Sequence, residues 1–220
     1  MAILSDARYA VQCVQSGNRV FVHGAAATPL VLLHGLVQNA DRLKNVELIH
    51  LHTEGAAIYT SGEYEENFRV TSLFAGRNLR DSLNSNRVDY LPCFLSEIPQ
   101  LFLSGRRPIQ VALLHVSPPD RHGFCTLGTS VDVARAAAQS AELIVAQINQ
   151  RMPRVHGDGF IHVDEIDHCI EIDEELPTPP VHEPTAEEKT IGAHVASLIE
   201  DGSCLQVGIG RIPNAVLAAL

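Results

Sequence analysis

The chain has 220 residues, of which 45% are hydrophobic and 19% are charged, and its formal net charge is −10. This length and composition are typical of a globular protein with a full hydrophobic core, and they exclude a disordered or fibrous chain. The acidic balance argues against a nucleic-acid-binding surface, which is usually basic over a whole face. The sequence has neither a run of roughly 18 apolar residues nor a signal-peptide pattern in its first ten, so we expect a cytoplasmic protein without nucleic-acid or membrane partners.

Helical and strand patterns alternate through the first half of the chain. Capping residues and periodicity predict helices over residues 5–16, with Ser5 as N-cap, and from Pro29 through Val37, with Thr28 as N-cap; a further helix is expected over residues 74–83. Strands are predicted over residues 19–22, 46–53 and 87–91, a loop over 55–68, and a short helix within 92–103.

A loop of small residues, 24–27, lies between the first of these strands and the helix after it. In open α/β sheets ligands gather beyond the carboxyl ends of the strands, so this loop is a secondary candidate site. A plain connection without a ligand is the alternative interpretation.

The second half continues the alternation. A nearly apolar strand over 109–116, a helix over 132–141 and a strand over 142–148 predict a right-handed βαβ unit. In the loop 117–123, Asp120 and His122 could act as acid–base groups, although closure of the turn by Asp120 is the favoured interpretation. Arg151 and Arg154 could meet an anionic substrate or simply face water. Strands are expected over 160–163 and 168–172, and the proline-rich stretch 174–184 is a candidate connector between subdomains.

The cysteines and histidines form no recognisable disulfide or metal pattern. The five cysteines are widely spaced and include no C-x-x-C pair, which predicts free and mostly buried thiols. His50 and His52 could place two imidazoles on one face of a strand, but no further residue has ligand spacing beside them. We therefore expect no metal site.

The C-terminal segment contains the main candidate site. Thr185 and Glu188 form a capping box that begins a helix ending near residue 202, and residues 204–207 resemble a short buried strand. Two glycines follow, and Pro213 fits the first position of a helix over 214–220. Backbone N–H groups at such a turn, together with the helix dipole, favour a phosphate, a carboxylate or an oxyanion. We name residues 208–212 the glycine turn. A tight connection without a ligand remains the alternative, since a dinucleotide fingerprint would need a third glycine at position 213.

The last predicted helix has no C-terminal capping signal before the sequence stops at Leu220. We therefore expect that the 220 residues are the first part of a longer protein, cut inside a helix.

Several stretches together resemble the acetyl-CoA hydrolase/transferase family, notably its 4-hydroxybutyrate CoA-transferases. They are SPPDRHG at 117–123, LGTSVD at 127–132, Asn149 with MPR at 152–154 and GD at 157–158, and LQVGIGRIP at 205–213, with DYLP at 89–92 and LSE at 95–97 as weaker matches. The resemblance implies an α/β fold with a mainly parallel sheet flanked by helices, of the class shared with sugar-phosphate isomerases. It also implies that residues 1–220 are the N-terminal domain of a two-domain subunit that forms homo-oligomers.

The resemblance further implies a reaction with acyl-CoA, in which CoA moves from a short-chain acyl group, such as acetyl or 4-hydroxybutyryl, to a carboxylate through a glutamyl-CoA intermediate. The family's catalytic glutamate has no counterpart here and is expected beyond Leu220, so this fragment alone should be inactive. Gly208, Ile209, Gly210, Arg211 and Ile212 match the family's CoA-contacting loop, and no metal is implied. An acetyl-CoA hydrolase and a non-catalytic metabolite-binding module of the same fold are the alternatives.

Overall fold

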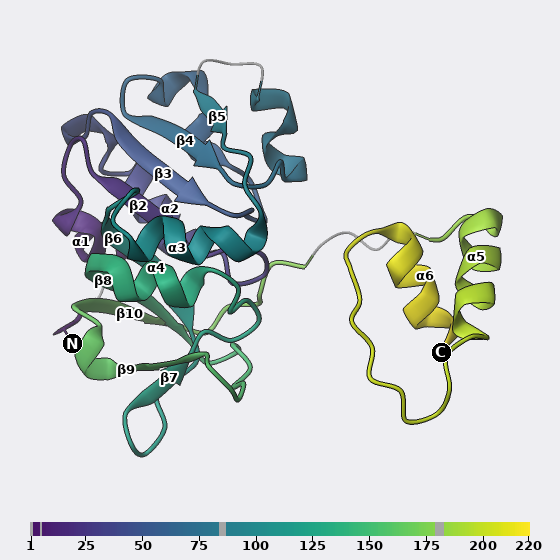
Figure 1. Cartoon of the computed structure of the whole chain (residues 1–220). Coiled ribbons are helices and arrows are strands. Elements are labelled where there is room, and N and C mark those ends of the chain that lie inside the picture. The colour runs from purple at the N-terminus through teal and green to yellow at the C-terminus, as the bar shows by residue number, and fades with distance from the viewer. Residues whose placement is uncertain (1, 5, 84–86, 179–182) are drawn as a thin grey trace. The chain divides into compact units, whose positions relative to one another are not determined.

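The computed structural model describes residues 2–4, 6–83, 87–178 and 183–220. The chain divides into two compact units, Met1–Thr178 and Pro179–Leu220, which we name the N-terminal unit and the C-terminal unit (Figure 1). The boundary falls within the candidate connector 174–184, of which residues 179–182 lie outside the described part.

The N-terminal unit is built on one parallel sheet of eight strands, in the order β1-β10-β8-β6-β2-β3-β4-β5. Each neighbouring pair of strands is parallel, and the predicted α/β class is confirmed. The strands are β1 (Ala2–Ile3), β2 (Arg19–Val22), β3 (Val46–His50), β4 (Phe68–Ser72), β5 (Val88–Tyr90), β6 (Ile109–Val116), β8 (Ala141–Asn149) and β10 (His168–Ile172).

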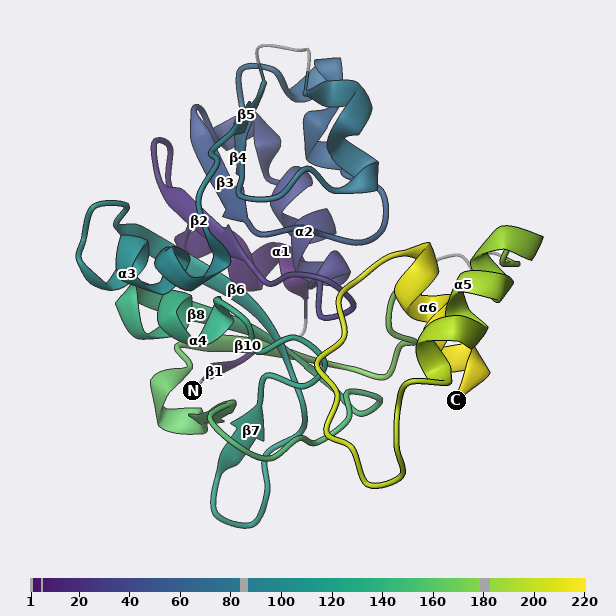
Figure 2. The same ribbon diagram turned by 45° about the vertical axis from the view of Figure 1, so that its right-hand side comes forward.

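Helices cover both faces of this sheet, as expected for buried parallel strands (Figures 1 and 2). On one face, Val20 and Leu48 pack with the helices α1 (Ala7–Ala10) and α2 (Leu30–Val37). On the other face, Phe21 and Ile49 pack with α3 (Ile98–Leu103) and α4 (Ala134–Ser140). Seven 3-10 helices complete the helical segments described in the N-terminal unit: η1 (Val11–Cys13), η2 (Ala40–Arg42), η3 (Ile58–Thr60), η4 (Gly62–Tyr64), η5 (Arg77–Ser82), η6 (Leu95–Glu97) and η7 (Val163–Glu165).

One predicted strand belongs to a different sheet. The segment β9 (Phe160–His162) pairs antiparallel with β7 (Phe124–Thr126) in a two-stranded ribbon outside the main sheet. This ribbon positions the loop after β6, because Ser117 N–H donates to the Thr126 carbonyl.

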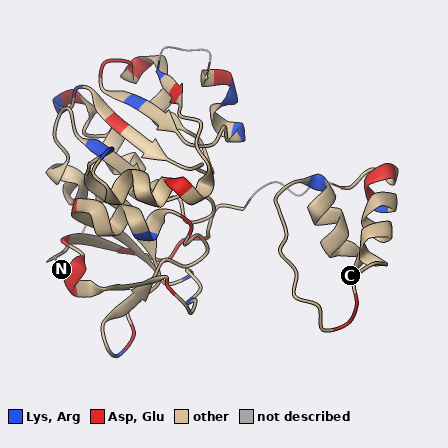
Figure 3. Ribbon diagram, viewed as in Figure 1, with Lys and Arg blue, Asp and Glu red and all other residues tan. Residues whose placement is uncertain are grey.

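Charged side chains are mixed in sign. In the view of Figure 3, the basic residues of the described chain are spread singly among acidic ones. One charge lies inside the sheet, where Glu47 of β3 is buried and accepts hydrogen bonds from Arg19 Nε at 2.9 Å and Thr71 Oγ1 at 2.7 Å.

The C-terminal unit contains two helices, α5 (Ala186–Ala196) and α6 (Arg211–Ala219). The predicted capping box is present, since the Thr185 hydroxyl accepts from Glu188 N–H and the Glu188 carboxylate accepts from Thr185 N–H. The helices approach closely at Gly192, where an added Cβ would lie 2.6 Å from the carbonyl oxygen of Ala215.

Several predicted elements differ from the structure at the N-terminus and in the middle of the chain. The first helix is short, because the Arg42 guanidinium takes the carbonyls of Val11 and Val14 that a longer helix would use. Its N-cap is Asp6, whereas the predicted cap Ser5 lies outside the described residues. The helix predicted over 74–83 is the 3-10 helix η5, and the polar strand β4 was not predicted at all.

The segments on either side of the glycine turn also differ from their predictions. Residues 204–207 form no strand with any described residue; they are exposed and have no neighbouring strand with which to pair. The helix α6 begins at Arg211, ahead of the predicted range 214–220, so Pro213 occupies its third position rather than its first.

Candidate functional site

The main sheet has a topological switch point between β2 and β6. From β2 the chain proceeds through β3 and β4 to β5 on one side, and from β6 through β8 to β10 on the other. The loops that leave β2 and β6 therefore diverge, and a ligand crevice in open α/β sheets lies at this place, beyond the carboxyl ends of the strands. The small-residue loop 24–27 follows β2 after His23, so the sequence prediction of its position at a strand end is confirmed.

This loop is joined to the loop after β3. Ala25 adopts a positive φ of 50°, which is uncommon for a residue other than glycine, and its N–H donates to the His52 carbonyl at 2.9 Å. An added Cβ on Gly24 would lie only 2.8 Å from the same carbonyl oxygen. The Thr28 hydroxyl donates to the Ala25 carbonyl and accepts the N–H of Glu54. Small side chains thus let two strand-end loops approach each other, and Glu54 is half-buried beside them.

A buried polar network lies beside the loop 24–27, at the ends of β6 and β8. The side chain of Gln147, near the end of β8, accepts the N–H groups of Val31 and Leu32 at the start of α2. Asn149 Nδ2 lies 3.0 Å from His115 Nε2 and also donates to the carbonyl of Glu174. These side chains were not proposed as site residues, although polar residues at the ends of otherwise apolar strands were a visible signal.

His23, directly after β2, completes the network. Its Nε2 lies 2.5 Å from the Ser130 carbonyl and must donate, while its Nδ1 accepts the N–H of His115 at 3.2 Å. Burial lowers the pKa of His23, and burial together with the neighbouring His23 lowers the pKa of His115 to about 4. Both imidazoles are therefore neutral near pH 7, and the network holds the switch point without charge.

The candidate histidine pair, His50 and His52, lies in two different surroundings. His50 is fully buried against the Tyr59 ring, whereas the ring of His52 packs edge-on against Phe74. Burial lowers the pKa of His50 to about 4, with a smaller contribution from His52. Among the residues that the structure describes, no group of three or more His, Cys, Asp and Glu side chains could hold a metal ion.

The loop after β6 is closed by its own aspartate. Asp120 Oδ1 accepts the N–H groups of His122 and Phe124, and Arg154 pairs with Oδ2 at 2.7 Å. These hydrogen bonds, first that from Phe124, lower the pKa of Asp120. Turn closure by Asp120 is the interpretation that the structure supports. Arg151 is likewise engaged, with Asp173 at 2.8 Å and Glu175 at 3.3 Å, so neither arginine is held ready for a substrate.

The thiols are free but not uniformly buried. All five cysteines are unpaired. Cys125 and Cys169 are buried, as expected for most of the thiols, whereas Cys204 is exposed. Burial raises the pKa of Cys125 to about 11. A protonated, buried thiol is a poor nucleophile, so these two cysteines are structural.

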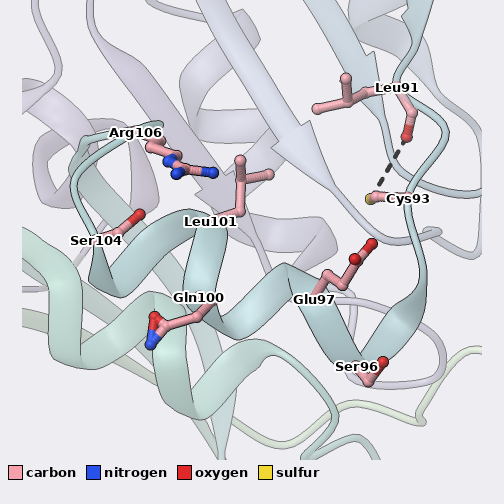
Figure 4. A pocket seen from close by; sticks show the side chains of 8 residues that line it. All are labelled: Leu91, Cys93, Ser96, Glu97, Gln100, Leu101, Ser104 and Arg106. Atoms are coloured by element: carbon pink, nitrogen blue, oxygen red, sulfur yellow. Dashed lines mark hydrogen bonds between the residues drawn. The ribbon is translucent and has the colours of Figure 1, made fainter.

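A pocket of about 540 Å³ lies between the segment after β5 and α3 (Figure 4). Cys93 Sγ donates to the Leu91 carbonyl, and burial, followed by the nearby Glu97, raises the pKa of this thiol. The Glu97 carboxylate accepts the N–H of Phe94 at 3.2 Å, as a helix cap does. The Cys93 thiol and the Glu97 carboxylate therefore both have structural partners, and neither is an activated nucleophile.

The glycine turn presents backbone N–H groups that have no partner in the described chain. Gly210 adopts a φ of 128°, which strongly favours glycine, and serves as the N-cap of α6 without a side-chain hydrogen bond. Within the described chain, the N–H groups of residues 205–209 have no hydrogen-bond partner. At the helix start, Asn214 N–H donates to the Gly210 carbonyl and Pro213 has no N–H, which leaves the N–H groups of Arg211 and Ile212 without an intrahelical partner.

The side chain of Arg211 pairs with a carboxylate of the neighbouring helix. Its Nε lies 3.3 Å from the Glu188 carboxylate in α5. An added Cβ on Gly208 would meet no atom within 4 Å, so this residue needs no glycine for the fold of the C-terminal unit itself. The available donors of the turn are thus backbone amides rather than side chains.

Comparison with known proteins gives the chain a context. The model of the acetyl-CoA hydrolase/transferase N-terminal domain matches residues 3–182. A 4-hydroxybutyrate coenzyme A transferase of Clostridium kluyveri is 43% identical over 99% of this chain and 51% of its own length. A succinyl-CoA:acetate/propanoyl-CoA:succinate CoA transferase of Fasciola hepatica is 45% identical over 94% of this chain and 44% of its own length.

A solved structure gives the same result. The crystal structure of a 4-hydroxybutyrate CoA-transferase from Porphyromonas gingivalis superposes with a TM-score of 0.80 at 32% identity, over 99% of this chain and 51% of that protein. The chain thus spans about half the length of the relatives it matches. In the part of the chain that is described, no helix is both long and apolar enough to cross a membrane.

Proposed function

Since this chain belongs to the acetyl-CoA hydrolase/transferase family, we propose that it is the N-terminal part of a CoA-transferase. The complete protein moves CoA between a short-chain acyl-CoA, such as acetyl-CoA or 4-hydroxybutyryl-CoA, and a carboxylate. The observation that carries this proposal is the similarity over nearly the whole chain to relatives named as CoA-transferases, at 43% and 45% identity.

The proposed reaction uses a glutamate of the second half. Its carboxylate attacks the thioester carbonyl, the acyl–sulfur bond breaks, and an acyl-glutamyl anhydride and CoA thiolate result. The thiolate then attacks the glutamyl carbonyl, which releases the first carboxylate and leaves a glutamyl-CoA thioester. A second carboxylate attacks this thioester, and the same two steps in reverse give the new acyl-CoA and restore the glutamate. No metal takes part.

Two glutamates of this chain, Glu97 and Glu188, have structural roles, which is consistent with a nucleophile elsewhere. Glu97 accepts the N–H of Phe94, and Glu188 accepts the N–H of Thr185 and pairs with Arg211. Glu54 is half-buried beside the loop 24–27, and its backbone N–H donates to the Thr28 hydroxyl. A nucleophile needs an exposed carboxylate free to approach a carbonyl at about 3 Å, and the first two are already bound as caps.

In this proposal the chain binds the CoA thioester. The free N–H groups at Gly208, Ile209, Arg211 and Ile212 face negative charge, from a phosphate or from the oxyanion that forms on the thioester oxygen. A single donor of this kind contributes about 3 kcal/mol to a transition state.

An acceptor-dependence assay on the complete polypeptide tests the function. We expect CoA release from acetyl-CoA to depend on an added carboxylate, and residues 1–220 alone to show no turnover. A rate that is unaffected by acetate would identify a hydrolase, in which water resolves the glutamyl thioester. Calorimetric binding of acetyl-CoA without any turnover would identify a non-catalytic module. Turnover by the fragment would contradict the assignment of the nucleophile to the second half.

A further inference from the structure

Another pocket of the N-terminal unit, which we name the α1 pocket, lies where α1 meets the turn after α2. It has a volume of about 550 Å³ and is lined by Arg8, Tyr9, Gln12, Asn39 and Arg42. The helices α1 and α2 lie side by side on one face of the main sheet (Figure 2). They are in close contact, because an added Cβ on Gly35 would lie 2.6 Å from the carbonyl carbon of Ala7. This packing fixes the walls of the pocket.

The α1 pocket lies at the end of the sheet opposite to the switch-point loops. The helix α2 begins after the loop 24–27, beyond the carboxyl end of β2, and returns the chain to the amino end of β3. Asn39 and Arg42 follow α2 in this return, and α1 precedes the amino end of β2. A ligand in the α1 pocket would therefore leave the carboxyl ends of the strands free.

Neutral groups hold the guanidinium of Arg42 in place. Its Nη1 donates to the Val14 carbonyl at 2.7 Å, its Nη2 donates to the Val11 carbonyl at 3.1 Å, and its Nε lies 3.4 Å from Asn39 Oδ1. Asn39 is only 5% exposed, and its Nδ2 donates to one carbonyl in each of α1 and α2. These partners orient the guanidinium without neutralising its charge, and one N–H on each terminal nitrogen is left for a ligand.

Arg8 adds a second cation to the pocket. Its exposed guanidinium makes no hydrogen bond or ion pair with any residue that the structure describes. Asp6 is the N-cap of α1 and accepts the backbone N–H of Arg8, and none of the described side chains that line the pocket is a carboxylate. In a chain with 26 acidic and 16 basic residues, two arginines without a carboxylate beside them favour an anion, most of all a phosphate.

Tyr9 supplies an aromatic surface next to these arginines. Its side chain is 58% exposed, whereas Ala7 and Ala10 of the same helix are buried in the core. An exposed aromatic ring can stack on a planar base, while neighbouring arginines bind a phosphate. The volume of about 550 Å³ is within the range of small-molecule sites, which is roughly 300–1,000 Å³.

We propose that the α1 pocket binds a nucleoside monophosphate, with its phosphate on Arg8 and Arg42 and its base on Tyr9. The two guanidinium groups recognise the charge, and the ring recognises a planar group at the other end of the ligand. This site is separate from the glycine turn, and the proposal does not depend on the proposed function.

Calorimetric titration of AMP into the complete polypeptide, with and without saturating CoA, tests the site. We expect the same AMP affinity in both titrations, because CoA does not occupy the α1 pocket. Ribose 5-phosphate lacks the base and adenosine lacks the phosphate, so each should bind at least about tenfold more weakly than AMP. Absence of AMP binding, or its loss when CoA is added, would overturn the proposal. Equal binding of AMP and either fragment would overturn the assignment of the missing group.

A pair of variants makes the test specific to the pocket. Arg8→Gln should weaken AMP binding at least about fivefold, because a charge-assisted hydrogen bond to the phosphate is lost. Arg80→Gln removes the same charge at an exposed position of η5 outside the pocket, and it should leave AMP binding unchanged. Both side chains are exposed, so both variants should fold. Equal AMP affinities of the two variants would contradict the proposal. Failure of the transferase proposal would be seen in acceptor-dependent turnover, which this titration does not measure.

Discussion

The side-chain oxygen of Gln147, near the end of β8, lies 3.1 Å from the amide nitrogen of Val31 in the first turn of α2. A strand on one side of the switch point thus caps the helix that leaves the other side. Pro29 precedes this helix and provides no side-chain cap of its own, so Gln147 takes the place that Ser, Thr, Asp or Asn usually has.

Replacing Gln147 by methionine should destabilise the protein by about 1–2 kcal/mol. Methionine has a similar volume but no strong acceptor, so the N–H groups of Val31 and Leu32 lose their partner inside the core. Urea denaturation followed by circular dichroism measures the change. Gln150→Met, at an exposed position of the turn after β8, is the control and should change stability by less than about 0.5 kcal/mol. Equal effects would show that the cap does not stabilise α2.

The stability should fall as the pH decreases from 6.5 toward 4, partly because of His50. Neither ring nitrogen of His50 has a hydrogen-bond partner in the described chain, although the nearby Leu51 backbone opposes the shift slightly. Because burial lowers the folded-state pKa from 6.5 to about 4, the unfolded state binds the extra proton first. Each pH unit below 6.5 then removes about 1.4 kcal/mol of stability, and above 6.5 the contribution is complete.

The variant His50→Leu removes this titrating group and should make the unfolding free energy less dependent on pH. Between pH 7 and pH 5, the loss of unfolding free energy should be smaller than in the parent protein by about 2 kcal/mol. The remaining slope belongs to other groups, among them His115, whose pKa is also about 4. Parallel stability curves for the two proteins would show that His50 does not titrate in this range.

The buried carboxylate Glu47 should matter far more than an exposed one in the same sheet. Glu47 is 8% exposed and pairs with Arg19 at 2.8 Å, so Glu47→Gln leaves a largely buried guanidinium without its counter-charge. The expected cost is about 3 kcal/mol. Asp89→Asn removes the exposed partner of Arg69, at 3.3 Å, and should cost less than about 1 kcal/mol. Thermal denaturation measures the stability of both variants. A similar loss of stability in each would contradict the expected effect of burial.

The alternation of helix and strand signals predicted the architecture because long apolar strands such as Ile109–Val116 carry a strong local pattern. The strand β4 escaped prediction because it is polar: its Thr71 faces the carboxylate of Glu47, a partner 24 residues away that no local pattern identifies. The segment 204–207 was wrongly predicted as a strand for the opposite reason. Its residues favour a strand, but a strand needs a neighbour, and the described chain supplies none.

The candidate site was predictable in its backbone and not in its side chains. The glycines of the turn and the small residues after β2 are visible in the sequence, because only small residues permit close approach of backbones. The pairing of Arg211 with Glu188, and of Arg154 with Asp120, depends on contacts across 23 and 34 residues. Arginines that could have met a substrate are therefore occupied.

Calorimetric titration of CoA into the complete polypeptide, with and without Gly208→Ala, tests most directly whether the glycine turn is the thioester site. Gly210 is the poorer target, because its φ of 128° strains any other residue, whereas a Cβ at Gly208 meets no atom within 4 Å. We predict an unchanged melting temperature and at least about tenfold weaker CoA binding, equivalent to about 1.4 kcal/mol, since the added methyl group blocks a ligand that contacts the backbone. Unchanged CoA affinity in a folded Gly208→Ala protein would contradict this account.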